Sequence, residues 1–415
     1  MAIPARKARA CVGLYVMCTV FTANSSRAAE WSALPSVAVR TEYDDNIRLT
    51  TAPHPTVWGI IVSPLVNFSA DTETLKVTGG LGVNVNRYFG EEGLDTVDYL
   101  LTLRSRYEGE RDLLALNVDA IRDSTLVSEL LETGVVEERR QRNRLSVNPS
   151  WTRALSEVIT LTANYAYSSV NYADTAGTNL IDYTDQNASI GATWKLSEYD
   201  LANVTGYYDR YETRPAQLKA DTYGIQAAYE RDFSETLHAA LSLGVRQTHS
   251  TLTSQGLVCE GTLVFGFCFG SVAAITLSET ERSTGYTALA SVEQRWQTDR
   301  LVGSVSRQLN PTGIGALAET DRLSVRWTRQ WSETVTSSLE GSVYRTRYVG
   351  NAVATSNSNF YRIQPTLSWR VSEGWTLTGG YSYSLVKYDQ TSATARANVA
   401  YLIASYTWPK FSISR

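Results

Sequence analysis

Long apolar segments are missing from this chain of 415 residues. After the first 28 residues no apolar run of about 18 residues occurs, so the sequence predicts no membrane-spanning helix. Only three histidines and two methionines are present. Zinc spacings, phosphate-binding loops and dinucleotide fingerprints are also absent, and we expect no cofactor. The formal net charge of −4 excludes neither a membrane surface nor a charged substrate, and we expect no nucleic-acid partner.

The N-terminus has the pattern of a secretory signal peptide. Basic residues at positions 6, 7 and 9 precede an apolar stretch at 11–21, and small residues follow at Ser26 and Ala28. The apolar stretch is too short to span a membrane. We therefore predict a signal peptide over 1–28, cleaved after Ala28 or alternatively after Ala29, and export of the mature chain 29–415.

Cysteine is scarce, and two of the four cysteines lie in the predicted signal peptide. The other two, Cys259 and Cys268, lie nine positions apart in the segment GLVCEGTLVFGFCFG. In an oxidising compartment this spacing predicts a local disulfide that pins a loop. Two unpaired thiols are the alternative.

A short turn motif recurs along the mature chain. An aromatic residue is followed by a basic residue and then by Ser-Glu, as in WTRALSE at 151–157, WTRQWSE at 327–333 and WRVSE at 369–373. Stretches of alternating apolar and polar residues flank each copy, which is typical of β-hairpins. Eight hairpins with one strand before and one after them predict an all-β fold, a transmembrane antiparallel up-and-down β-barrel over 29–415. We expect 18 strands, with 16 as the alternative, the first at 36–49.

The alternation assigns the two faces of each strand. In the stretch 236–250, Leu241 and Leu243 alternate with Ser242, and the apolar set is expected to face lipid. Tryptophans concentrate beside the tight turns, which predicts an aromatic girdle at one membrane interface. A second girdle is expected at the other strand ends, formed by Tyr88, Tyr167, Tyr172, Tyr348 and Tyr388.

The polar residues that alternate with this apolar set are predicted to line a water-filled bore. Arginine predominates in this set, so the bore is expected to favour anionic solutes. Inward tyrosines, among them Tyr207, Tyr211 and Tyr344, are candidates for stacking on sugar rings. Mutual neutralisation of the charges across a wide barrel is the alternative. The predicted lumen-lining residues are Arg104, Arg106, Arg142, Arg144, Arg246, Arg295, Arg322, Arg326, Arg362, Asp119, Asp209, Glu230 and Glu340.

The sequence gives little support for a catalytic site or a metal-binding site. None of His54, His238 and His249 has a serine or aspartate at a spacing that sets up a base and a nucleophile, so we do not expect an enzyme. An outer-membrane hydrolase remains a minor alternative. In the segment TEYDDNIRL at 41–49, Asp44 and Asp45 alternate between faces, which favours a polar strand end over a cation site.

The segment EYDDNIRL after the signal, the W-x-R-x-x-SE turns and the Trp-Pro pair near the C-terminus resemble a family of outer-membrane β-barrel porins associated with exopolysaccharide and exosortase-type gene clusters. This resemblance implies a pore in the cell outer membrane for export of a polysaccharide or passage of hydrophilic solutes. We expect outer-membrane lipid to surround the barrel. The closing strand ends in Tyr406 and Trp408 and resembles the C-terminal signal read by the barrel-assembly machinery. We expect no N-terminal plug, because the first strand begins close to the cleavage site, so a periplasmic export partner is expected to be a separate protein.

A different class of function is a structural or assembly barrel. Its outer loops would bind a partner or a surface polymer, and the loop with Cys259 and Cys268 is rich in phenylalanine. This loop would either dock a partner or fold inward and plug the bore.

Overall fold

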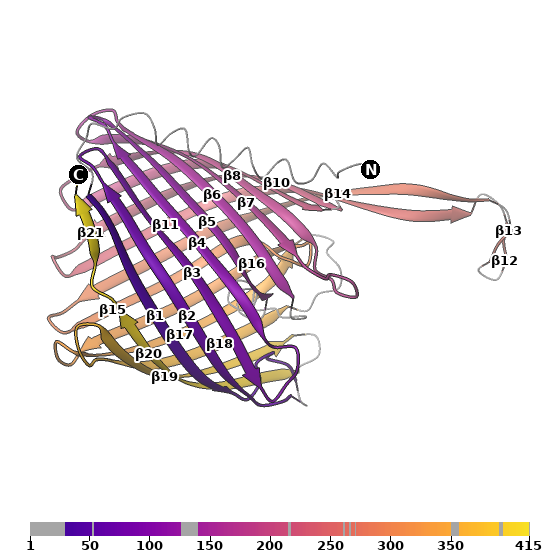
Figure 1. Cartoon of the computed structure of the whole chain (residues 1–415). Coiled ribbons are helices and arrows are strands. Elements are labelled where there is room, and N and C mark those ends of the chain that lie inside the picture. The colour runs from indigo at the N-terminus through magenta and orange to yellow at the C-terminus, as the bar shows by residue number, and fades with distance from the viewer. Residues whose placement is uncertain are drawn as a thin grey trace, which may run out of the picture.

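The computed structural model of the chain describes residues 30–51, 54–125, 140–214, 217–259, 262–264, 267–269, 271–349, 357–389 and 393–414. Within these residues an antiparallel sheet of 18 long strands closes on itself as a barrel (Figure 1). The described part contains no helix long and apolar enough to cross a membrane. The barrel strands are β1 (Glu30–Asp44), β2 (Val57–Asp71), β3 (Leu75–Phe89), β4 (Thr96–Glu108), β5 (Asp112–Ser124), β6 (Gln141–Ala154), β7 (Ile159–Tyr172), β8 (Asp182–Lys195), β9 (Asp200–Arg214), β10 (Leu218–Asp232), β11 (Leu237–Cys259), β14 (Val272–Arg295), β15 (Asp299–Pro311), β16 (Leu317–Gln330), β17 (Val335–Val349), β18 (Ser358–Arg370), β19 (Trp375–Tyr388) and β20 (Thr394–Thr407).

The barrel closes where β1 pairs with β20, from Ser36 opposite Thr407 to Asp44 opposite Val399. The C-terminal tail adds a short strand, β21 (Phe411–Ser414), which pairs with residues 30–33 of β1. The tail therefore does not hang free. The first strand also begins six residues earlier than predicted, because the tail gives its opening residues a ladder partner.

The recurrent serines shape the tight turns. Ser332 Oγ accepts a hydrogen bond from the backbone N–H of Val335 at 3.1 Å, and Ser234 Oγ does the same for Leu237 at 3.1 Å. A side-chain oxygen that satisfies a backbone donor three residues on holds the chain in a turn. The serine recurs because these tight turns need the same local chemistry.

Pro64, Pro149 and Pro365 lie inside strands, on the outer face, and each interrupts a ladder. The β2–β3 ladder runs to Val62 opposite Val85 and resumes at Leu65 opposite Gly82, so the positions around Pro64 are skipped while the register is kept. The ladders beside Pro149 and Pro365 have the same two-residue interruption. A proline without an N–H loses a local ladder bond, and here the neighbouring pairs preserve the register.

The outer face carries a band of exposed apolar side chains. Tryptophans lie on it beside the tight turns, with Trp331 59% and Trp369 48% exposed. The predicted second girdle is wrong for three of its tyrosines. Tyr172 is buried among inner-face residues, Tyr388 packs against a buried inner cluster, and Tyr88 donates to Glu42 Oε1 at 2.9 Å.

Strands β11 and β14 continue past the barrel as a two-stranded ribbon that projects away from it (Figure 1). Near its tip, β12 (Thr262–Val264) pairs with β13 (Phe267–Phe269). The side chains of Cys259 and Cys268 lie outside the described residues, so the disulfide stays a prediction. The described ribbon does not enter the bore, and the segments that fill the bore are different ones.

Candidate functional site: the lumen and its mouth

The inner face of the barrel is identified by burial and register. On β11, Arg246 is 4% exposed, whereas its neighbour Val245 is 59% exposed. Because side chains alternate along a strand and ladder partners share a face, this assignment extends through the neighbouring strands. The inner face is polar and aromatic, and it is most deeply buried toward the end of the barrel that carries the long loops.

One segment folds into the mouth after β1. Asn46 Nδ2 donates to the carbonyl oxygens of Thr50 at 2.7 Å and Arg396 at 2.9 Å, and the Asp45 carboxylate accepts from Asn398 Nδ2 at 2.6 Å. Leu49, held at a φ of +48°, then packs against inner residues of β17 to β20. The acidic motif at 41–49 therefore anchors this segment. Among the described residues, no group of three His, Cys, Asp or Glu side chains is placed to hold a metal ion.

A second segment enters the mouth from the other side, at the tip of the β15–β16 hairpin. Tyr211 of β9 donates from its hydroxyl to the carbonyl of Thr312 at 3.0 Å, and the N–H of Ile181 donates to the carbonyl of Gly313 at 2.7 Å. Leu317 is buried here in an apolar cluster with inner side chains of β7 to β10. The hairpin tip is thus fixed against the inner wall.

The ladders show where the β15–β16 hairpin separates from β14. The β14–β15 ladder ends at Ala288 opposite Arg307, although β15 runs on to Pro311. Beyond Arg307, β15 pairs only with β16, while β16 stays paired with β17 up to Leu317 opposite Val349. The hydrogen bond between Tyr211 and Thr312 places the tip of the hairpin inward. A side chain that would face outward on a straight strand, such as Glu319, then lies 3.8 Å from the inner-face Arg246.

The inner faces of β16 to β20 and β1 carry three arginines, two of them over aromatic rings, which we call the arginine wall (Arg322, Arg362 and Arg40). The Arg322 guanidinium lies 4.9 Å from the ring centroid of Tyr344, and that of Arg40 lies 4.2 Å from the ring centroid of Tyr401. Arg362 donates to Ser382 Oγ at 3.0 Å and to Gln364 Oε1 at 2.7 Å. Among the described residues Arg362 has no carboxylate within 4.0 Å, so its charge is available to a solute.

Tyr401 lies flat because Gly380 leaves room beneath it. A Cβ at Gly380 would come within 2.3 Å of the Tyr401 ring. We expect Gly380→Val to push the ring off the wall and to break the hydrogen bond from Gln364 Nε2 to the Tyr401 hydroxyl, now 2.9 Å. The predicted loss of stability is about 1–3 kcal/mol, measured as urea unfolding in lipid vesicles. The adjacent Gly379 has no atom within 4 Å of an added Cβ, so Gly379→Val is the matched control. Equal losses in both variants would contradict the packing role of Gly380.

Two acids lie on the facing wall, on β8 and β9. Asp185 and Asp209 line a cavity of about 410 Å³ between this wall and the inward hairpin, together with Tyr207, Gln226 and Arg246. Asn187 Nδ2 donates to Asp209 Oδ1 at 2.5 Å. The cavity is polar and open toward the bore, so it offers hydroxyl-rich solutes both donors and acceptors.

Most of the arginines predicted to line the lumen have carboxylate neighbours, so little of the arginine excess acts as free positive charge. Arg144 donates to Ser146 Oγ at 3.2 Å, and Glu230 lies exposed near the tight-turn end of β10. The ion pairs are Arg104 with Asp119 (2.6 Å), Arg106 with Glu108 (2.6 Å), Arg142 with Asp123 (3.1 Å), Arg326 with Glu340 (2.7 Å) and Arg295 with Glu293.

The predicted residue set omitted Asp185, Gly380 and Tyr401. Alternation alone identifies Asp185, since Ile190 and Trp194 set the outward parity of its strand. Gly380 and Tyr401 carry no such signal, because a glycine and an aromatic ring occur on either face. The three histidines lie apart from one another. His54 Nδ1 is 2.7 Å from the carbonyl oxygen of Asp45, and His238 Nδ1 is 2.8 Å from Asp232 Oδ1. The ring of His249 contacts the ring of Tyr223.

No family model and no curated protein matches the chain. The structure is similar to solved structures at low identity. OpdQ of Pseudomonas aeruginosa aligns at 10% identity and a TM-score of 0.47, over 91% of this chain and 99% of that chain. OccK2 (OpdF) of the same organism, in complex with glucuronate, aligns at 9% and 0.47, over 90% and 97%. OccAB4 of Acinetobacter baumannii aligns at 9% and 0.44, over 94% and 100%. Likenesses this distant carry no argument about function.

Proposed function

We propose that the chain is an outer-membrane channel, exported through its signal peptide over 1–28. The apolar outer band, the tryptophans at one edge of it and the closed 18-stranded sheet support this placement. Short turns on one side and long connections on the other orient the barrel, with the long connections outward. Lipid therefore contacts the outer face, and the barrel-assembly machinery is the expected folding partner.

The solutes we propose are hydrophilic and anionic. The arginine wall is the observation that carries this proposal, because Arg322 and Arg362 set positive charge on one side of the bore, whereas Arg40 is neutralised by Glu42 at 2.6 Å. Eight barrel strands lie between β9 and β20 in each direction, so Asp185 and Asp209 face this wall across the bore. Opposed charges create a transverse field that selects solutes by charge and orientation.

Acidic saccharides match this lining best. Tyr401, beside Arg40, offers a partly exposed ring face to the bore, whereas Tyr344 and Phe360 are buried with Leu49 and are closed to a sugar. Aromatic faces suit sugar rings, and guanidinium groups suit carboxylates. Export of an exopolysaccharide, handed over by a separate periplasmic protein, is the specific function we propose.

A structural barrel is the second candidate, favoured by the two segments in the mouth. Leu49 and Leu317 are 3% and 5% exposed, so each segment is packed as firmly as a protein core. A permanently closed barrel would display the β11–β14 ribbon to a surface polymer without passing solute.

Planar-bilayer conductance separates the two candidates. Folding of the refolded mature chain is checked first, by the difference in its gel mobility between unheated and heated samples. We expect stable anion-preferring channels that acidic oligosaccharide fragments block and neutral fragments of the same size block less. Folded protein that leaves the bilayer silent would overturn the channel and favour the structural barrel.

A further inference from the structure

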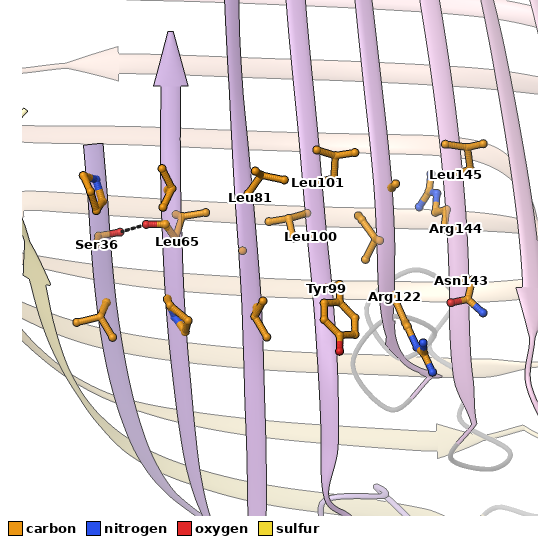
Figure 2. Close-up of a pocket in the computed structure, with 18 of the residues that line it drawn as sticks. Ser36, Leu65, Leu81, Tyr99, Leu100, Leu101, Arg122, Asn143, Arg144 and Leu145 are labelled. Carbon is orange, nitrogen blue, oxygen red and sulfur yellow. Dashed lines mark hydrogen bonds between the residues drawn. The ribbon is translucent and has the colours of Figure 1, made fainter. Parts of the chain in front are cut away.

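A groove crosses the outer face of β1 to β7, on the side away from the lumen (Figure 2). Its cavity volume is about 960 Å³. Two rows of outward side chains form its walls, and the inward-facing residues between them, such as Leu100, contribute the floor. One row runs through Val83, Tyr99 and Arg122, and the other through Leu81, Leu101 and Leu145.

The groove runs perpendicular to the strands. It crosses seven neighbouring strands, so its length is about 29 Å at the usual strand spacing of about 4.8 Å. Small side chains keep it hollow, because Ala120 and Pro64 stand where other positions of this face carry leucine or tyrosine. Its lining is almost entirely apolar over this length.

The groove becomes polar at one end, where Arg122, Asn143 and Asn171 are neighbours across the ladders. All three are exposed on the outer face. The Arg122 guanidinium lies 5.9 Å from the ring centroid of Tyr99 and donates to Gln141 Oε1. Among the described residues it makes no ion pair.

A second hollow continues from this polar end. Its volume is about 460 Å³, and Tyr99 and Arg122 line both hollows. Arg140, Ser124 and Gln141 add further polar groups to it. Of its two aspartates, Asp95 is 2.5 Å from Arg87 Nη1, and Asp174 is exposed. An apolar groove that opens into a polar hollow beside Arg122 has the shape and polarity of an amphiphile.

We propose that the groove holds an acyl chain of a phosphorylated lipid of the outer leaflet, with the phosphate at Arg122 in the polar hollow. The site is distinct from the lumen and rests only on the proposed membrane placement. An exposed arginine beside an apolar surface stabilises a phosphate through paired, charge-assisted hydrogen bonds. The placement at the long-loop end assigns the lipid to the outer leaflet.

Native mass spectrometry of the mature protein, refolded in a neutral detergent, tests this site. The probes are bis-phosphorylated lipid A and the same lipid with both phosphates removed. The unmodified protein should bind one phosphorylated molecule about tenfold more tightly than the dephosphorylated one. Arg122→Gln should abolish that preference while leaving binding of the dephosphorylated lipid unchanged. Ala120→Trp, which fills the groove, should weaken the binding of both lipids about tenfold.

Lys387→Gln is the matched control, because Lys387 also lies over an outward tyrosine at the long-loop end, 5.8 Å from the ring centroid of Tyr361, and borders neither hollow. This variant should keep the full preference for phosphorylated lipid. Equal loss in the Lys387 and Arg122 variants, or no loss in either, would overturn the site. A dimer that Ala120→Trp dissociates would instead assign the groove to a second copy of the chain. Conductance should be the same in all variants, so failure of the lipid site is distinguishable from failure of the channel.

Discussion

Shortening the β15–β16 hairpin should raise single-channel conductance at least about threefold, because an 18-stranded barrel with a clear mouth holds an aqueous channel. Gln308 and Thr320 are ladder partners, so an Asn-Gly turn can join them in place of residues 309–319. The change removes Leu317 and both hydrogen bonds that fix the tip to Tyr211 and Ile181. Arg246 loses Glu319 as a neighbour but gains water from the opened mouth.

The matched control shortens the other long hairpin. Leu252 and Glu279 are ladder partners, and an Asn-Gly turn between them removes the projecting ribbon with both of its cysteines. Conductance should stay as in the unmodified protein, because the described ribbon lies outside the bore. A rise in this variant, with none after the β15–β16 change, would show that the ribbon closes the channel and that the hairpin does not.

Neutralising Arg322 and Arg362 of the arginine wall should weaken the anion preference of the channel. A unit charge about 6 Å from a passing ion is worth about 0.7 kcal/mol in water, so Arg322→Gln with Arg362→Gln should lower the anion-to-cation permeability ratio about tenfold. Reversal potentials across a salt gradient measure this ratio. The change should shrink at 1 M salt, where the screening length falls to about 3 Å.

Outward charges on neighbouring strands provide the control for this prediction. Lys387 and Arg396 lie on the outer face of β19 and β20, so Lys387→Gln with Arg396→Gln removes the same charge without touching the bore. That pair should leave the permeability ratio within about twofold of the unmodified channel, since the wall and lipid separate these sites from the ion path. If both double variants shift the ratio equally, the selectivity comes from overall charge and the arginine wall has no special role.

The strands, turns and faces were predictable because they depend on local chemistry. Ser332 holds its turn through a bond three residues away, and Leu243 and Val245 face outward by alternation with Arg246. The strand count followed from the turns. Pro64 lies inside β2 but affects only its own ladder bonds, and fifteen β1–β2 pairs run past it without a shift.

The contents of the bore were not predictable, because they depend on contacts between distant segments. Leu49 reads as part of the first strand, and only its packing against Phe360 and Val386 reveals an inward segment. The Ile181 N–H meets Gly313 across the mouth, a pairing that no local pattern indicates. Tyr172 and Tyr388 have the position of girdle residues along their strands, but burial against other inner side chains decides their face.

The seam between β1 and β20 has a consequence for the rate at which the chain folds. Its ladder joins Asp44 to Val399, and β21 extends it to the last described residues, with Lys410 Nζ 3.4 Å from Glu30 Oε1. Contacts so far apart in sequence slow folding, because the entropy lost in bringing the ends together precedes any gain. Until the final strand pairs with it, the edge of β1 that will meet β20 presents unpaired backbone groups to any neighbouring chain. Pairing of β1 with β20 is therefore the step that completes folding of the barrel. The last twenty or so residues, more than any hairpin before them, determine the lifetime of the open intermediate.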